Sequence, residues 1–328
     1  MIGKKINTLK KIIGNRLADR GLYAPGHRKG LCILMYHGID RTEDTRFNER
    51  FFSVQHFEEH IAYLSQHTHI LNDHEFATKA LHPDKLNVLL TFDDGYANNY
   101  RYALPVLEKY QAHAYFFITG MAGNRTPVLW ADAVDIVAAN AADGSTLELD
   151  GHKFILHGRK FTSGEGVGLK SYVKASTRAD YAQKQALTEQ LLGLYDFTKQ
   201  KSLEDYWQLM TDAEIVDASK SSCITIGSHG YYHHNLGSLA HADAVAEVGR
   251  SKKYLEQLVQ REVRSIAFPD GSYTEQLNDD LMALGFDRQF LVSYRQEDDR
   301  KRSYTYDRLG LYPSMGNAHR ILYKIMRG

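Results

Sequence analysis

The stretch from Asn87 to Tyr96, NVLLTFDDGY, is an apolar run that ends in two adjacent aspartates and a glycine. Such a run, bounded by a turn signal, predicts a buried strand. Asp93 and Asp94 would then lie at the rim where parallel α/β folds bind ligands. Side chains of successive strand residues point to opposite faces, so one carboxylate can bind a cation while the other handles protons. Two solvated acids at a loop start are the simpler interpretation of an isolated DDG.

Apolar runs of strand length recur along the chain and alternate with helix-like segments. This alternation predicts a parallel α/β sheet or barrel, and seven candidate strands favour a barrel. No Gly-x-Gly-x-x-Gly follows any of them, so a dinucleotide-binding fold has little support. The expected strands are Leu31–Tyr36, Val88–Phe92, His113–Ile118, Cys223–Gly227, Arg264–Phe268, Gln289–Val292 and Arg308–Leu311, and the expected helices are residues 55–66, 98–110, 206–219, 241–259 and 275–284.

The alternation fails once, between about residues 131 and 205. There LELDGHKFIL predicts a hairpin around Asp150-Gly151, and a helix is expected near residues 179–199. We expect this segment to be an insertion on the barrel. The expected organisation is therefore an N-terminal helix over residues 1–26, a barrel domain over 27–315 and a tail over 316–328.

The composition excludes several classes of protein. Forty basic residues balance forty acidic ones, so the basic surplus typical of nucleic-acid binding is absent. Two cysteines, Cys32 and Cys223, lie in apolar runs and are expected to be reduced core thiols. No stretch approaches the roughly 18 apolar residues of a membrane span.

The first residues are basic and amphipathic, with apolar side chains at helical spacing over residues 2–21. They have no continuous apolar core and no small-residue cleavage site, so we do not expect a signal peptide and expect a cytoplasmic enzyme. The predicted helix packs on its own domain or makes peripheral contact with a membrane surface.

A second informative segment is ITIGSHGYYHHNL, residues 224–236, in which His229 and His233 follow a strand four residues apart. At this spacing, in a helical or tightly turned segment, two imidazoles can converge on one ion. A carboxylate from Asp93 or Asp94 would complete a site of two histidines and one carboxylate with open positions, as catalytic metals need. Zinc is the first expectation, with Fe, Co and Ni as alternatives for the same ligands.

Two further segments place polar or turn residues at strand ends. LCILMYHGI, residues 31–39, ends its strand in His37, and RSIAFPDGSY, residues 264–273, turns through Pro269 and Gly271. Each has a simple explanation alone, as a surface histidine and a plain turn. Together, the four segments place titratable or turn residues on one rim of a barrel.

TFDDGY, SHGYYH and AFPDGSY resemble the signature segments of the NodB-homology polysaccharide deacetylases, carbohydrate esterase family 4, across most of residues 31–312. The resemblance implies a deformed (β/α) barrel and metal-dependent N-deacetylation of an acetylated amino sugar. It assigns the general base to Asp93, the metal to Asp94, His229 and His233, and oxyanion binding to the backbone N–H of Tyr96.

The chain departs from the family pattern at the catalytic acid. Most members carry it in a Leu-His segment near the carboxyl end, which LYPSMGNAHRILYKI lacks. LCILMYHGI resembles instead the rearranged subgroup that includes biofilm poly-N-acetylglucosamine deacetylases, where the acid-bearing strand comes first. His37 is therefore the candidate acid, with His319 as a weaker one. His234 stands where members often have proline and is a weaker alternative metal ligand.

A second departure concerns the arginine that many members carry before the proline of the third motif, where this chain has Phe268. Orientation of Asp93 by an arginine is therefore in doubt, and Arg264 or Arg308 would substitute only if the fold brought one of them close. Candidate substrate-binding residues are Pro269, Gly271, Tyr273 and Trp130, the two aromatic ones through stacking on sugar rings or, more simply, as core residues.

Several alternatives stay open to different degrees. An aspartyl-nucleophile phosphatase needs Asp-x-Asp, and a receiver domain would not need the histidine pair. A metal-dependent amidase on a non-sugar amide and a non-catalytic carbohydrate-binding relative remain. For the deacetylase, we expect a cytoplasmic precursor of a surface polysaccharide, either nucleotide-linked or lipid-linked.

Overall fold

The computed structural model describes residues 29–123, 128–175 and 181–327. The amphipathic helix expected over residues 2–21, with its proposed membrane contact, lies outside the described residues. Within the described ranges, no helix is long and apolar enough to cross a bilayer.

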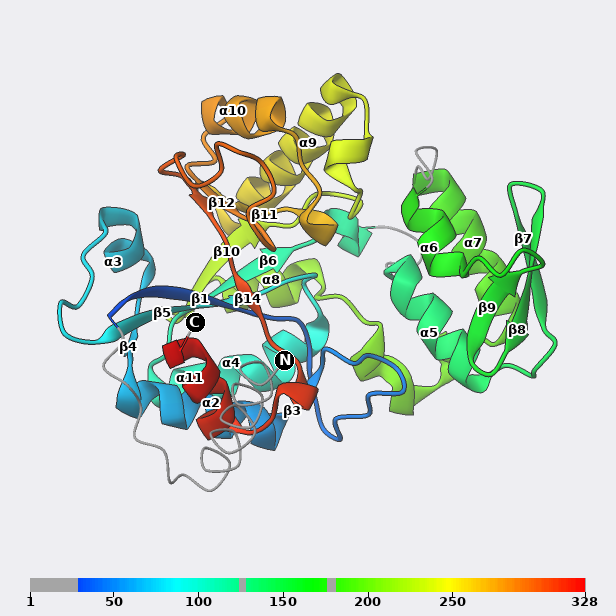
Figure 1. Cartoon of the computed structure of the whole chain (residues 1–328), viewed down its shortest axis with the longest axis horizontal. Coiled ribbons are helices and arrows are strands. Elements are labelled where there is room, and N and C mark those ends of the chain that lie inside the picture. Colours follow the sequence, from blue (N-terminus) through cyan, green and yellow to red (C-terminus); the bar gives the residue numbers. More distant parts are fainter. Residues whose placement is uncertain (1–28, 124–127, 176–180, 328) are drawn as a thin grey trace, which may run out of the picture.

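The centre of the fold is a curled sheet of parallel strands (Figure 1). Neighbouring strands follow the order β13-β12-β11-β10-β6-β5-β1-β14, and β4 pairs with β5 beside this path. All seven expected strands are present, so the predicted barrel-like α/β fold is confirmed. The strands are β1 (Gly30–Tyr36), β4 (His69–Ile70), β5 (Leu86–Phe92), β6 (Ala114–Ile118), β10 (Ile224–Ser228), β11 (Ser265–Ala267), β12 (Arg288–Phe290), β13 (Thr305–Tyr306) and β14 (Leu309–Gly310), while β2 (Ile39–Asp40) and β3 (Phe52–Ser53) form a separate pair.

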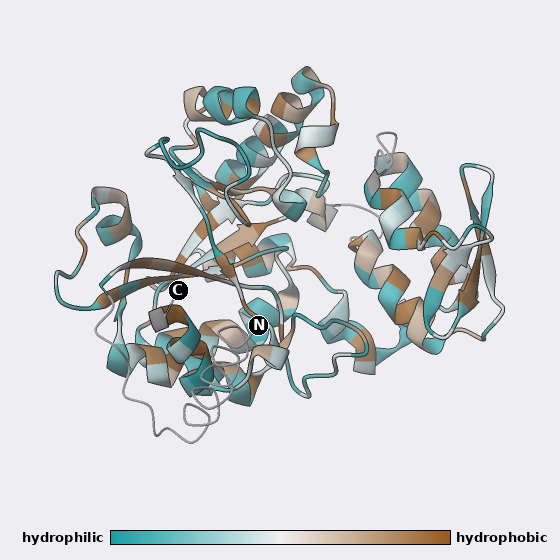
Figure 2. Cartoon of the chain, in the orientation of Figure 1, coloured by the Kyte–Doolittle hydropathy of each residue, from teal (hydrophilic) through white to brown (hydrophobic). Residues whose placement is uncertain are grey.

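Helices cover the outside of this sheet, so its central strands are buried on both faces. Every residue of β5 is buried. Leu90 and Phe92 belong to the large core between strands and helices, whereas Leu89 packs inside the curl with Tyr115 and Phe117. The central strands are accordingly hydrophobic and the surrounding helices two-sided in Figure 2. The helices are α2 (Val54–His67), α3 (Asp73–Thr78), α4 (Leu104–Tyr110), α8 (Asp212–Ala218), α9 (His241–Val259), α10 (Glu275–Ala283) and α11 (Ala318–Arg327).

The two ends of the sheet are joined by a short segment of chain. β13 and β14 stand at opposite ends of the strand order, yet only Asp307 and Arg308 separate them in sequence. The chain therefore crosses from one edge of the curl to the other, and the Arg308 side chain is fully buried at this crossing.

The insertion forms a lobe with its own hydrophobic core, on the right in Figure 1. The hairpin expected around Asp150-Gly151 is present, and a third strand extends it into an antiparallel sheet. Helix α5 opens the lobe, with Ile136 and Val137 fully buried in the lobe core. The elements of the lobe are α5 (Trp130–Asn140), β7 (Thr146–Leu149), β8 (His152–His157), β9 (Lys160–Ser163), α6 (Leu169–Ala175) and α7 (Tyr181–Leu194).

Two expected elements differ from the structure. The helix predicted over residues 206–219 begins at Asp212, because Thr211 and Glu214 form a capping box there and residues 201–206 are a separate 3-10 turn. The segment expected as a tail, residues 316–328, contains helix α11, which packs on α2 and places Ile321 and Ile325 in the main core.

Candidate active site

The turn after β5 aims Asp94 at the rim. Asp94 and Gly95 both have left-handed backbones, with φ of 76° and 80°. A Cβ on Gly95 would lie 3.2 Å from the Ile118 Cα, so glycine allows this turn to sit tightly against the end of β6. The Asp94 side chain is consequently buried.

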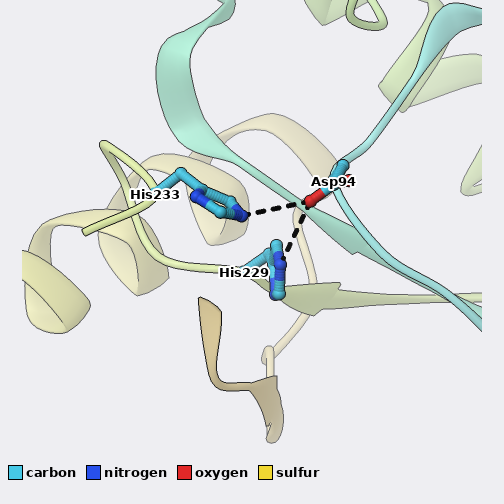
Figure 3. Close-up of side chains that lie close together, drawn as sticks. All are labelled: Asp94, His229 and His233. Atoms are coloured by element: carbon cyan, nitrogen blue, oxygen red, sulfur yellow. Dashed lines mark ion pairs between the residues drawn. The ribbon is translucent and has the colours of Figure 1, made fainter. Parts of the chain in front are cut away.

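Asp94, His229 and His233 converge on one point, as Figure 3 shows. The Asp94 Oδ1 lies 3.3 Å from the His229 Nε2 and 3.2 Å from the His233 Nε2. His229 follows β10 directly, and His233 reaches the same point from the following loop, where its own φ is 51°. These are the three residues that the resemblance assigned to the metal.

The hydrogen bonds of His229 show that this trio suits a cation. The His229 Nδ1 lies 2.8 Å from the Ala267 carbonyl oxygen, which can only accept, so Nδ1 carries the proton. In the neutral ring, Nε2 then offers a lone pair toward the Asp94 carboxylate, which is also an acceptor. A bound divalent metal or an added proton resolves this conflict. Burial lowers the pKa of His229, but Asp93 and Asp94 outweigh it and the net pKa is raised.

Asp93 forms a buried two-point ion pair with Arg308. The Arg308 Nη1 and Nη2 donate to the two carboxylate oxygens over 2.6 and 2.8 Å. Burial raises the pKa of Asp93, but Arg308 and His229 reverse this and the pKa falls below its usual value. Arg308 is thus the arginine placed to orient the Asp93 carboxylate, whereas Arg264 pairs with Asp287 on the surface.

His37 lies beside Asp93 because β1 and β5 pair in register. Tyr36 stands opposite Phe92, and the Asp93 N–H donates to the Tyr36 carbonyl over 3.1 Å. Burial, assisted by the Arg50 charge, lowers the pKa of His37 to about 3. The imidazole is therefore neutral near pH 7 in the free protein, and a catalytic acid at this position must gain its proton during the reaction.

Tyr96 is positioned through both its backbone and its phenol. Among the described residues, none accepts a hydrogen bond from the Tyr96 backbone N–H, so this group is free to donate to a ligand. Its phenol donates to the Asp132 Oδ2 over 2.7 Å, and Asp132 comes from helix α5 of the insertion. Burial raises the pKa of Asp132 to about 7 against the opposing charge of Arg50.

A cavity of about 580 Å³ opens above these groups, between the barrel rim and the insertion. Its lining includes His37, Asp93 and the cluster of Asp94, His229 and His233 from the barrel. The insertion contributes residues of α5 and α6, and the loop before α2 contributes Arg50. The insertion residues in the lining are Leu129, Trp130, Ala131, Asp132, Asp135, Lys170 and Lys174.

Arg50 and Asp132 were not predicted from the sequence. The Arg50 Nη1 lies 3.7 Å from the Asp94 Oδ2, and its Nη2 lies 3.9 Å from the Asp132 Oδ1. Asp132 had one available signal, a carboxylate in the first turn of the apolar segment LWADAVDIV. Arg50 had none, because its loop has no periodic pattern.

Among the candidate substrate-binding residues, only Trp130 lines the cavity. Tyr273 packs on Phe268 and donates its phenol to Asp299, so it is a core residue. Pro269 and Gly271 do not line the cavity, although their neighbours Phe268 and Asp270 do.

The two weaker histidine candidates lie outside the trio. His319 is on α11, with its ring 4.2 Å from that of Tyr63 on α2. His234 is buried with its Nδ1 3.2 Å from the Lys184 Nζ. Neither belongs to the cavity lining.

Known proteins resemble this chain in sequence and in fold. YxkH of Bacillus subtilis (strain 168), whose name assigns it to the polysaccharide deacetylases, is 37% identical over 94 residues, which are 27% of this chain and 32% of YxkH. The match thus spans about a third of that relative's length. The structure of IcaB from Ammonifex degensii aligns with a TM-score of 0.55 at 17% identity and covers 90% of this chain and 97% of that one. The Streptococcus pyogenes deacetylase PplD, in complex with acetate, aligns with a TM-score of 0.56 at 16% identity, over 89% and 96% of the two chains.

The family comparison spans the segments that build the site. The model described as polysaccharide deacetylase matches residues 81–288, more than half of the chain, and includes both Asp94 and the histidine pair. His37 lies before this match and Arg308 lies after it. His37 nevertheless lines the cavity, and Arg308 donates to Asp93, which lines it too. With its curled parallel sheet and its Asp-His-His cluster at the carboxyl ends of the strands, the chain belongs to the polysaccharide deacetylase family.

Proposed function

We propose that this protein is a metal-dependent hydrolase that removes N-acetyl groups from an acetylated amino sugar. The observation that supports this most is the adjacency of two differently held carboxylates at one cavity. Asp94 faces two imidazoles, while Asp93 forms an ion pair with Arg308. One carboxylate is thus placed to bind a cation and the other to accept a proton, which are the two tasks that amide hydrolysis requires.

Asp94, His229 and His233 would hold the metal. When bound, a divalent ion such as Zn²⁺ lowers the pKa of an attacking water to roughly 7 and polarises the substrate carbonyl. Two histidines and one carboxylate also accept Fe, Co and Ni, so zinc is the first expectation among several ions.

Asp93 would take the proton of the attacking water. Its low pKa keeps it ionised at neutral pH, and the two hydrogen bonds from Arg308 fix the plane of the carboxylate. The free N–H of Tyr96 would donate to the oxyanion that develops on the carbonyl. A single donor of this kind typically contributes about 3 kcal/mol to transition-state stabilisation.

His37 would return a proton to the departing amine. The nearby carboxylates Asp93 and Asp94 favour its imidazolium form, against burial and Arg50. Because burial and Arg50 lower the pKa of His37, a proton relayed to it from Asp93 would be held weakly and donated readily to the amine.

The cavity supports a small or activated acetylated sugar as the substrate. Its volume of about 580 Å³ is that of a small-molecule site, and Trp130 offers an indole in its wall. Nucleotide-linked and lipid-linked precursors both fit this description, and assignment to the cytoplasm stays a prediction.

Acetate release separates the candidate functions. Purified enzyme with added Zn²⁺ or Co²⁺ should release acetate from N-acetylhexosamine oligomers or from a nucleotide-linked N-acetylhexosamine, and Asp93→Asn should not. Faster release from non-sugar acetamides would identify an amidase instead. Metal binding without release from any acetylated compound would identify a non-catalytic relative. Release from long polymer alone would exclude an activated precursor.

A further inference from the structure

Residues 229–234, here called the ligand loop, carry both of the proposed metal-binding imidazoles. The loop follows β10 and belongs to no helix or strand. Gly230 and His233 have φ values of 73° and 51°, so the backbone is left-handed at two positions of this loop. A loop of this kind needs contacts from outside to keep one conformation, because its own ladder hydrogen bonds are missing.

A carboxylate on helix α9 supplies that contact. The Glu247 Oε1 accepts the backbone N–H groups of Tyr231 and Tyr232, each over 2.8 Å. The side chain is buried, where leaving either N–H without an acceptor would be costly. A Cβ on Gly230 would lie 3.0 Å from the same oxygen, so the glycine allows the loop to close onto the carboxylate.

Two basic side chains also contact this loop. Arg250, on the same helix as Glu247, places its guanidinium 4.2 Å from the Tyr231 ring and donates to the Tyr232 hydroxyl over 2.6 Å. Lys184, from helix α7 of the insertion, donates to the His233 carbonyl over 3.1 Å. Glu247 accepts from the two residues that precede His233.

We propose that Glu247 is a positioning residue, whose buried carboxylate fixes the ligand loop so that the His233 imidazole faces Asp94 and His229. This inference rests on the proposed metal site. Groups that orient metal ligands typically contribute about 10–100-fold to metal affinity or activity. Glu247 does not line the cavity, so it would not contact the substrate. Its replacement is therefore expected to weaken metal binding and lower turnover while leaving substrate affinity unchanged.

Cobalt(II) provides a direct probe of the ligand geometry. We expect Glu247→Ala to weaken Co²⁺ and Zn²⁺ binding about 10–100-fold in competition with a chromophoric chelator, and to change the visible d–d spectrum of the Co²⁺ form. Glu247→Gln keeps an oxygen that can accept both N–H groups, and its affinity should recover toward that of the wild type. In Glu247→Ala, kcat should fall while KM stays near its wild-type value, and Glu247→Gln should recover most of kcat.

A matched control separates positioning from general loss of stability. Val248 is the next residue on α9 and is fully buried in the main core. Val248→Ala should lower stability while leaving metal affinity and the Co²⁺ spectrum unchanged. If Glu247→Ala does not fold, Glu247→Asp keeps a carboxyl group but withdraws it by one methylene and should also weaken binding.

The outcomes distinguish this inference from the proposed function. Wild-type protein that binds neither Co²⁺ nor Zn²⁺ would contradict the proposed metal site itself. Wild-type protein that binds them, together with Glu247 variants of equal affinity and identical Co²⁺ spectrum, would overturn the role of Glu247 alone.

Discussion

Asp93→Asn is expected to retain bound metal and to lose about 10²–10⁴-fold in turnover, the usual contribution of a positioned general base. Asparagine keeps the size of the side chain but cannot take a proton from water. His229→Ala should lose both metal and turnover, because its Nε2 faces the Asp94 Oδ1 at 3.3 Å, where we propose that the metal binds. Elemental analysis of the purified variants gives the metal content, and acetate release gives the turnover.

The two variants serve as controls for each other. Circular dichroism should show both folded, since each changes one side chain at the cavity. Equal loss of metal in Asp93→Asn and His229→Ala would contradict the division of labour between Asp93 and Asp94.

Arg308→Met is expected to destabilise the fold by about 3–5 kcal/mol and to abolish most activity, because it leaves Asp93 as an unpaired buried charge. The exposed fractions of the two side chains, 0% and 4%, explain why water cannot replace the guanidinium. Urea denaturation at pH 7 measures the free energy of unfolding. Arg264→Met is the matched control: it removes a partly exposed partner of Asp287 and should cost at most about 1 kcal/mol.

Arg308→Met should also change the pH dependence of the rate in a defined direction. In the wild type, the folded-state pKa of Asp93 is below its unfolded value, mainly because Arg308 outweighs burial. Its contribution to stability is therefore present above the unfolded pKa and is lost as pH falls through the folded pKa. Without Arg308, burial raises the pKa, so the acid limb of the rate profile should move to higher pH. An acid limb at the same pH in both proteins would contradict the assignment of Asp93 as the base held by Arg308.

Much of the fold follows from local patterns in the sequence. The strands are short apolar runs bounded by turns, and the hairpin at Asp150-Gly151 has a strong two-residue turn signal. The clustering of Asp94, His229 and His233 was also predictable, since all three lie at or just beyond strand ends that a parallel sheet brings to one edge.

The residues that support the site were harder to predict, because they act across long sequence distances. Arg308 follows Asp93 by 215 residues and reaches it only because the chain crosses between the ends of the sheet. Asp132 reaches the cavity because the insertion folds back over the rim, which no periodicity indicates. Glu247 occupies an ordinary polar position in a helical pattern, and only the structure shows that it faces inward toward the ligand loop.

The central claim, that one divalent ion is held by Asp94, His229 and His233, is tested most directly by removing and restoring metal. Protein dialysed against a strong chelator should lose acetate release, and about one equivalent of Zn²⁺ or Co²⁺ per chain should restore it. Full activity in the metal-free protein, with no response to added ions, would contradict the account.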